Sequence, residues 1–392
     1  MINYCFNFRS LFLAIALMGG LGLVTHATAS RSYNLDLNTM TPIPLDGLGG
    51  EYTSVIDIND AGQAVGAALR PGVIELRGFI TDPNAMWASE IGTLGGYSSQ
   101  ASGINNEGQV VGGSGTRGDG THAFITGPDG IGIRDLGTLG GYFSGANDIN
   151  NIGQVAGYSY TDENETHAFI TGPDGMRMRD LGTLGGYFST ANGINDIGQV
   201  AGYSYTDENE MHAFITGPDG IGMRDLGTLG GKSSAANDIN NVGQVAGYSY
   251  TDEGEKHAFI TGPDGMGMRD LGTLGGRWSE ARGINNAGQV VGEFEVGNGY
   301  EHAFITGPNG EDMRDLNSLL HVSGGWILAS AVGISNDGHI VAWAVPEHTL
   351  TVPEPETYTL MLAGLGLIGF VAWRKKSEDR GSCCAIAPNR NY

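Results

Sequence analysis

Short runs in which apolar residues alternate with small or polar ones recur along most of this 392-residue chain. Between residues 144 and 186, such runs cover 144–150, 154–160, 167–171 and 176–184, and glycine-containing turns separate them. A period of two is typical of a strand with one buried face, and the Asn-Ile-Gly and Pro-Asp-Gly segments are typical of tight turns. This unit therefore predicts four short strands.

The turn sequence Ile-Asn-x-x-Gly-Gln marks one such unit after another. Its copies begin at Ile58, Ile104, Ile149, Ile194, Ile239 and Ile284, and a divergent copy begins at Ile334. A period of about 45 residues with four strands per unit is typical of β-propeller blades, whereas helical repeats need longer amphipathic runs. We expect an all-β fold, a β-propeller of about seven four-stranded blades. An open β-solenoid is the alternative, because both architectures stack units that cannot bury their own faces alone.

The two ends of the repeat region predict how a ring would close. Residues 33–37 and 41–48 have the pattern of the last two strands of a blade, and residues 329–335 and 339–345 have that of the first two. Together they predict a seventh, composite blade.

The first 29 residues have the features of a secretory signal. Arg9 precedes an apolar run over residues 11–24, and Ala27-Thr28-Ala29 follows as an A-x-A cleavage site. We expect cleavage after Ala29, which leaves residues 30–350 as the ectodomain; an uncleaved N-terminal anchor is the alternative.

Near the other end, residues 357–373 carry no charge and are followed by Arg374-Lys375-Lys376. Seventeen apolar residues are about the minimum for a transmembrane helix, and basic residues place their flank in the cytoplasm. The sequence therefore predicts one helix through the inner membrane, with residues 377–392 as a cytoplasmic tail.

Directly before this span stands Val352-Pro353-Glu354-Pro355. Residues 351–376, with Pro-Glu-Pro, an apolar helix and a basic cluster in that order, resemble the PEP-CTERM sorting signal of Gram-negative bacteria. The resemblance implies an exosortase as processing partner, export to the cell surface or medium, and an exopolysaccharide or biofilm context. Glu356 and the tail after the basic cluster depart from the family pattern. An ordinary C-terminal anchor with an accidental Pro-Glu-Pro is the alternative.

The units themselves resemble the extracellular HAF repeats. The resemblance rests on His-Ala-Phe at His122, His167, His212, His257 and His302, and on Asp-Leu-Gly-Thr-Leu-Gly-Gly at Asp135, Asp180, Asp225 and Asp270. The first unit has Arg77-Gly78-Phe79 instead. This family implies an extracellular location and no defined activity.

Composition narrows the function. A formal net charge of −23 opposes binding to nucleic acid, because phosphate is neutralised by basic residues. The three cysteines, Cys5, Cys383 and Cys384, all lie outside the predicted ectodomain, which excludes disulfides and cysteine-bound metals there. We find no catalytic motif and no Asp/Glu/His cluster that breaks the repeat, so we expect no enzyme, no metal and no cofactor.

The five histidines occupy one blade position each, so a ring would hold them far apart. We expect them to be structural, with each bonded to a neighbouring strand or to the Asp of Asp-Leu-Gly. The segments at Asp57 and Asp148 faintly resemble calcium loops, but their fifth positions are Ala61 and Ile152. An Asn-initiated turn explains the same residues more simply.

Residues that vary between units are the better candidates for recognition. In an antiparallel meander, the residues after each Gly-Gly pair would share one face with the acidic loops 162–165, 207–210 and 252–255. Aromatic rings beside carboxylates suit glycan binding, so we predict a glycan or protein ligand face; the alternative is that these rings only pack between blades. A secreted propeller hydrolase acting on polysaccharide is the second functional hypothesis. The candidate ligand residues are Tyr97, Tyr142, Phe143, Tyr187, Phe188 and Trp278.

Overall fold

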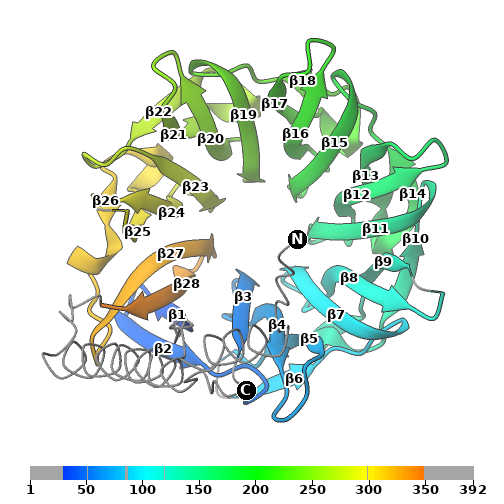
Figure 1. Cartoon of the computed structure of the whole chain (residues 1–392), viewed down its shortest axis with the longest axis horizontal. Helices are drawn as coiled ribbons and strands as arrows, with labels where there is room; N and C mark the ends of the chain where they lie inside the picture. Colours follow the sequence, from blue (N-terminus) through cyan, green and yellow to red (C-terminus); the bar gives the residue numbers. More distant parts are fainter. Residues whose placement is uncertain (1–29, 51, 84–86, 119, 298, 348–392) are drawn as a thin grey trace, which may run out of the picture. The chain divides into compact units, whose positions relative to one another are not determined.

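The computed structural model describes residues 30–50, 52–83, 87–118, 120–297 and 299–347. Over these residues the chain folds into 28 strands and six single-turn 3-10 helices. The strands form four-stranded blades arranged around a central axis, with the first strand of each blade innermost (Figure 1). The predicted β-propeller is confirmed.

Several predictions concern residues outside the described ranges. These are the signal segment with Ala27 and Ala29, the Val352-Pro353-Glu354-Pro355 motif, the helix over 357–373 and the tail. Within the described ranges, none of the helices has the length and apolarity needed to span a bilayer.

Six blades are continuous in sequence. Blade 1 comprises β3 (Thr53–Ile58), β4 (Ala64–Leu69), β5 (Leu76–Thr81) and β6 (Ala88–Glu90), and blade 2 comprises β7 (Gly95–Ile104), β8 (Val110–Thr116), β9 (Thr121–Ile125) and β10 (Arg134–Gly137). Blade 3 comprises β11 (Gly140–Ile149), β12 (Val155–Thr161), β13 (Thr166–Gly172) and β14 (Met176–Asp180), and blade 4 comprises β15 (Gly185–Ile194), β16 (Val200–Thr206), β17 (Met211–Ile215) and β18 (Arg224–Asp225). Blade 5 comprises β19 (Gly230–Ile239), β20 (Val245–Thr251), β21 (Lys256–Thr261) and β22 (Met268–Gly272), and blade 6 comprises β23 (Ser279–Ile284), β24 (Val290–Glu295), β25 (Glu301–Ile305) and β26 (Arg314–Asp315).

The seventh blade joins the two ends of the propeller. Its strand order is β2 (Thr41–Leu45), β1 (Arg31–Asp36), β28 (His339–Pro346) and β27 (Trp326–Ile334). β1 pairs antiparallel with β28, with Leu35 opposite Ile340. This is the predicted composite blade, and it closes the ring that an open solenoid would leave open.

Five of the 3-10 helices lie at the Pro-Asp-Gly or Pro-Asn-Gly turns between third and fourth strands, and the sixth precedes blade 7. They are η1 (Pro128–Gly130), η2 (Pro173–Gly175), η3 (Pro218–Gly220), η4 (Pro263–Gly265), η5 (Pro308–Gly310) and η6 (Leu316–Ser318). Asp174 in η2 has φ 55° and Gly175 has φ 65°, so the turn requires residues that tolerate left-handed backbone.

The hydrophobic core lies between blades. One cluster contains Val111 and Ile125 of blade 2 together with Ile149, Val155 and Phe169 of blade 3. The phenylalanine of each His-Ala-Phe sequence is completely buried in such a cluster. A single blade therefore cannot bury its own apolar faces, as expected for stacked repeats.

Strand boundaries differ from the predicted ones at the ends. β11 begins at Gly140, four residues before the predicted start, because Gly140 pairs with Thr161 of β12. A Cβ at Gly141 would lie 2.5 Å from the Tyr160 Cβ, so only glycine allows this approach. β14 ends at Asp180 rather than at the predicted residue 184, since the chain then turns toward blade 4.

Asparagines of the repeated turn join each blade to the next. The Asn150 Oδ1 accepts the backbone N–H of Gln154 at 2.9 Å, and its Nδ2 donates to the Asn195 carbonyl of blade 4 at 2.9 Å. The same inter-blade donation from Nδ2 occurs at Asn59, Asn105, Asn195, Asn240 and Asn285. The Asn-initiated turn, the simpler alternative to a calcium loop, is therefore present.

The residues that follow these asparagines form a second ring, and this ring is closed. The Asn106 Oδ1 accepts the Asp60 N–H at 3.0 Å, and the Asp60 Oδ1 accepts the Asn336 N–H at 2.7 Å. Between these two bonds, the same contact runs through Asn151, Asp196, Asn241 and Asn286. Seven blades are thus connected in one unbroken circle.

The asparagine turn predicts a measurable cost of losing one side chain. Asn150 is 3% exposed, and Asn150→Ala leaves the Gln154 N–H without its partner and removes the bond to the Asn195 carbonyl, which still accepts the Gly198 N–H. We expect a loss of about 1–3 kcal/mol in the free energy of unfolding, measured by urea denaturation. Glu107→Ala, at an exposed position of the equivalent turn in blade 2, should stay within about 0.5 kcal/mol. Equal stability of the two variants would contradict this role of the turn.

Candidate ligand-binding face

The connections between strands lie on two opposite faces. The acidic loop after β12 and the Gly-Gly segment before it share one face, because Gly140 pairs with Thr161. The Asn-Gly and Pro-Asp-Gly turns share the other, where the Gly175 N–H donates to the Gly153 carbonyl at 2.9 Å. We call the first the loop face and the second the turn face; both were predicted from the strand order.

The six predicted ligand residues divide into two groups. Tyr97, Tyr142 and Tyr187 are 81%, 63% and 56% exposed. Phe143 and Phe188 are half-buried and stack on tyrosines of the second strands, with ring centroids 5.8 Å from Tyr158 and Tyr203 respectively. Trp278 is also half-buried, with the Lys256 ammonium 4.2 Å from its ring centroid. The three tyrosines are therefore the exposed members of the set, and one ring face of Tyr187 stacks on Tyr205, with centroids 5.5 Å apart.

A groove between blades 2 and 3 lies on the loop-face side. Blade 2 has Gly113 where blade 3 has Tyr158, as the strand registers show. The missing ring leaves a cavity of about 300 Å³. Its walls include Gln100, Phe143, Asn147 and Tyr158. We call it the blade 2–3 groove.

Sequence reasoning missed this groove, although a signal was present. Residues 112–115 read Gly-Gly-Ser-Gly, whereas blades 3–5 have Gly-Tyr-Ser-Tyr at the equivalent positions. Blade 2 thus lacks two tyrosine rings that blades 3–5 carry. Without them, blades 2 and 3 leave the space between them unfilled.

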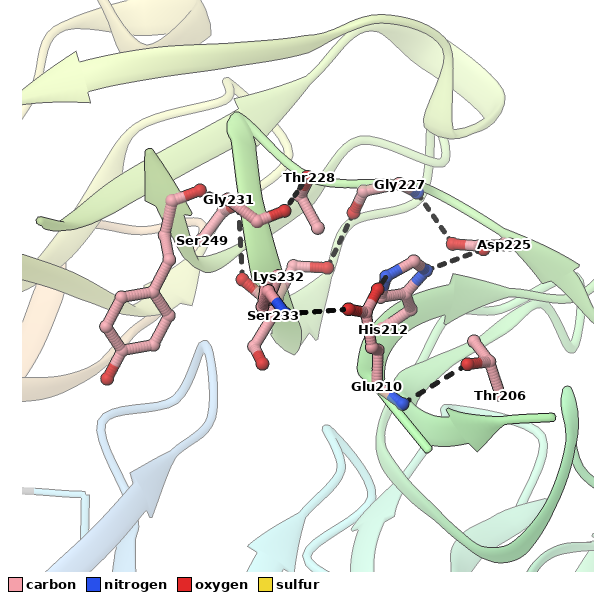
Figure 2. A network of polar contacts seen from close by, with 12 residues as sticks. Thr206, Glu210, His212, Asp225, Gly227, Thr228, Gly231, Lys232, Ser233 and Ser249 are labelled. Carbon is pink, nitrogen blue, oxygen red and sulfur yellow. Dashed lines mark hydrogen bonds and ion pairs between the residues drawn. The ribbon is translucent and has the colours of Figure 1, made fainter. Parts of the chain in front are cut away.

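The five repeat histidines make the predicted contact with aspartate. His212 Nδ1 lies 2.7 Å from Asp225 Oδ2, and the other Asp225 oxygen accepts the Gly227 N–H at 2.7 Å (Figure 2). The pairs His122–Asp135, His167–Asp180, His257–Asp270 and His302–Asp315 repeat this geometry. Each pair joins the third strand of a blade to the segment through which the chain leaves that blade. The five pairs lie in five different blades, so they do not form one common site.

Blade 6 carries a charged cluster that the sequence reasoning did not recognise. Arg282 lies 3.0 Å from Glu280 and 2.7 Å from Glu293, and Lys256 of blade 5 lies 2.8 Å from Glu280. Both glutamates are buried. The expectation that no Asp/Glu cluster breaks the repeat is therefore wrong: the sequence Ser-Glu-Ala-Arg at residue 279 replaces Ser-Ala-Ala-Asn of blade 5.

Three aspartates face the central channel from alternate blades. Asp57, Asp148 and Asp238 each accept the N–H of the following isoleucine and that of the equivalent isoleucine in the next blade, at 2.7–2.9 Å. At the equivalent position the intervening blades have glycine; a Cβ at Gly103 would lie 2.9 Å from the Asp148 Cα. Over the described residues, no group of three His, Cys, Asp or Glu is arranged to hold a metal ion.

Burial in the channel raises the pKa values of these three carboxyl groups. Desolvation raises the pKa of Asp57 to about 6 and that of Asp238 to about 7, and nearby Asp57 adds repulsion at Asp238. The pKa of Asp148 is raised well above its ordinary value by desolvation and by repulsion from the other two. The backbone donors oppose these shifts only in part.

Comparison with known proteins identifies the C-terminal segment. Residues 351–376 match the PEP-CTERM protein-sorting motif. The predicted sorting motif is confirmed. It implies an exported, exosortase-processed protein whose C-terminal tail anchors it in the membrane before processing. No curated protein sequence matches the chain. The resemblance of the repeats to the HAF family stays a prediction.

Solved structures share the fold. The β-propeller domain of the Trilobed protease from Pyrococcus furiosus, which has an open velcro topology, superposes with a TM-score of 0.53 at 10% identity, over 75% of this chain and 89% of that one. TolB from Agrobacterium tumefaciens gives 0.47 at 10% identity, over 81% and 98%. A prolyl endopeptidase gives 0.49 at 13% identity, over 70% of this chain and 44% of that one. At such identities the likeness concerns the propeller fold alone.

The raised pKa values of the channel aspartates predict how stability depends on pH. The folded state retains protons between pH 4 and about 7 that the unfolded chain releases, so this contribution to stability is lost as pH rises through that window. For Asp238 it amounts to about 4 kcal/mol at most. Asp238→Asn should flatten the fall in the free energy of unfolding between pH 5 and 8, measured by denaturant titration at each pH. A slope identical to that of the unmodified protein would contradict the assignment.

Proposed function

We propose that this exported PEP-CTERM protein is a non-enzymatic surface or matrix protein whose propeller binds a glycan on its loop face. The observation that carries the proposal is the blade 2–3 groove. Exposed Tyr97 and Tyr142 belong to the two blades that form it, and the stacked rings of Phe143 and Tyr158 form one of its walls.

The groove offers the two kinds of contact that a sugar needs. Aromatic rings pack against the apolar C–H face of a pyranose, and the side chains of Gln100, Ser102 and Asn147 can bond its hydroxyls. A ligand without negative charge suits a protein with a net charge of −23.

The hydrolase hypothesis is less well supported than binding. Glycoside hydrolysis requires a pair of carboxyl groups free to act as acid and as base or nucleophile. The buried pair Glu280 and Glu293 is held by Arg282 in ion pairs of 3.0 and 2.7 Å. These contacts favour a structural role for the pair.

One substitution fills the groove without removing any contact. Gly113→Tyr restores the residue that blades 3–5 carry, and a Cβ there meets nothing closer than 3.5 Å. We expect this variant to keep its melting temperature and to lose glycan-array binding. Tyr97→Ala with Tyr142→Ala should weaken binding by roughly tenfold or more. Tyr250→Ala, an exposed tyrosine of blade 5, is the control. Glycan binding that survives Gly113→Tyr would show that the groove is not the binding site. Binding of a protein and of no glycan would show that the ligand is a protein.

Sorting by an exosortase predicts where the mature chain ends. The intact mass of the protein from the outer surface and medium of the host should correspond to a C-terminus near residues 352–356. An uncut C-terminus retained in the inner membrane would instead indicate a simple anchor.

A further inference from the structure

A second cavity lies inside the channel, on the loop-face side of the three aspartates. Ile56, Asn237 and Arg282 line it, and each directly precedes the Asp or Gly of the channel floor on its innermost strand. The volume is about 300 Å³. We call it the channel-mouth cavity.

The walls of this cavity differ in chemistry. Val55, Ile56, Val332 and Trp343 from blades 1 and 7 form an apolar side. Trp343 is 38% exposed, and its indole N–H donates to the Val55 carbonyl at 2.9 Å, which fixes the ring. A held and partly open indole is suited to contact with a flat apolar ligand face.

The opposite side is polar. Asn192 and Asn237 donate their Nδ2 protons to the Ala236 and Ala281 carbonyls at 2.8 and 2.7 Å. The Asn237 amide oxygen can therefore accept a bond from a ligand, and the Asn192 oxygen has one long contact, 3.5 Å from the Asn147 Nδ2. Arg282 completes this side, with 40% of its side chain exposed. Donors and acceptors therefore face an aromatic ring across one small cavity.

The charge around Arg282 limits what can bind. Arg282 and Lys256 are opposed by Glu280 and Glu293. Desolvation by burial raises the pKa of Glu301, and repulsion from Glu293 adds to this rise. The guanidinium can donate hydrogen bonds, but no net positive charge remains for a carboxylate or phosphate.

We propose that the channel-mouth cavity binds one uncharged sugar residue, with its C–H face on Trp343 and its hydroxyls on Asn192, Asn237 and Arg282. The assignment rests on the proposed glycan-binding function and locates a second subsite for the same ligand. The two cavities adjoin, because Asn147 of the blade 2–3 groove lies 3.5 Å from Asn192 Oδ1. The groove holds the chain of the glycan, and the channel mouth holds its end.

The test uses the mature propeller and three sets of probes. These are neutral laminari-, cello- and malto-oligosaccharides, oligogalacturonate, and oligomers of glucosamine, titrated by calorimetry and by tryptophan fluorescence. Val332→Phe fills the cavity and leaves its polar side intact. Arg282→Met removes the donor, and Trp343→Phe keeps a ring but removes the indole signal.

We expect a neutral oligosaccharide to bind, and Val332→Phe and Arg282→Met to weaken it roughly tenfold. Val332→Phe should keep its melting temperature, whereas Arg282→Met should lower it, because the buried Glu280 and Glu293 lose an ion-pair partner. Trp343→Phe should abolish the fluorescence change. Glu293→Gln should create affinity for oligogalacturonate, because it leaves Arg282 less neutralised.

Each other outcome counts against the proposal. Loss of binding in Gly113→Tyr but not in Val332→Phe or Arg282→Met would leave the proposed function standing and overturn the second subsite. A preference of the unmodified protein for oligogalacturonate or glucosamine oligomers would overturn the uncharged ligand. Absence of binding to every probe would overturn the subsite and the proposed function together.

Discussion

The propeller depends on hydrogen bonds that pass from one blade to the next through the repeated asparagine turns. Each asparagine oxygen folds its own turn, and its amide nitrogen reaches the carbonyl of the neighbouring blade. The adjoining ring of seven contacts returns to its start at Asp60, across the junction where the two ends of the propeller meet. The apolar core is shared between neighbouring blades. Each blade can therefore bury both of its faces only if the ring is closed, and closure depends on this ring of hydrogen bonds and on the β1–β28 pairing.

Because the asparagine-turn contacts lie on the turn face, residues on the loop face can vary without affecting them. Repeated residues build the turn face and the inter-blade core, so substitutions near the loop face change cavities without disturbing closure. Blade 2 replaces tyrosines with Gly113 and Gly115 and opens a groove. Blade 6 replaces small and amide side chains with Glu280 and Arg282 and makes one side of the channel mouth polar.

The fold and one set of contacts could be predicted from the chain. Four strands per unit, the composite blade and the bonds of His122, His167, His212 and His257 to the Asp of Asp-Leu-Gly all follow from spacing and chemistry in the repeat. Of the aromatic residues predicted to form the ligand face, however, Phe143, Phe188 and Trp278 are half-buried by second-strand tyrosines or by Lys256. Their neighbours lie 15 or more positions away in sequence, so no local pattern indicates which rings are covered.

The sequence by itself determined the repeat, the strand order, the closure by the chain ends and the sorting motif, because each depends on local periodicity or on a contiguous segment. Only the tertiary structure decided that Asp57, Asp148 and Asp238 meet in one channel and that Trp343 faces Arg282 across a cavity. The reason is geometric. Residues at equivalent positions of the repeat belong to different blades. Their separation in space depends on the number of blades and on the tilt of each blade, and neither can be read from a single repeat.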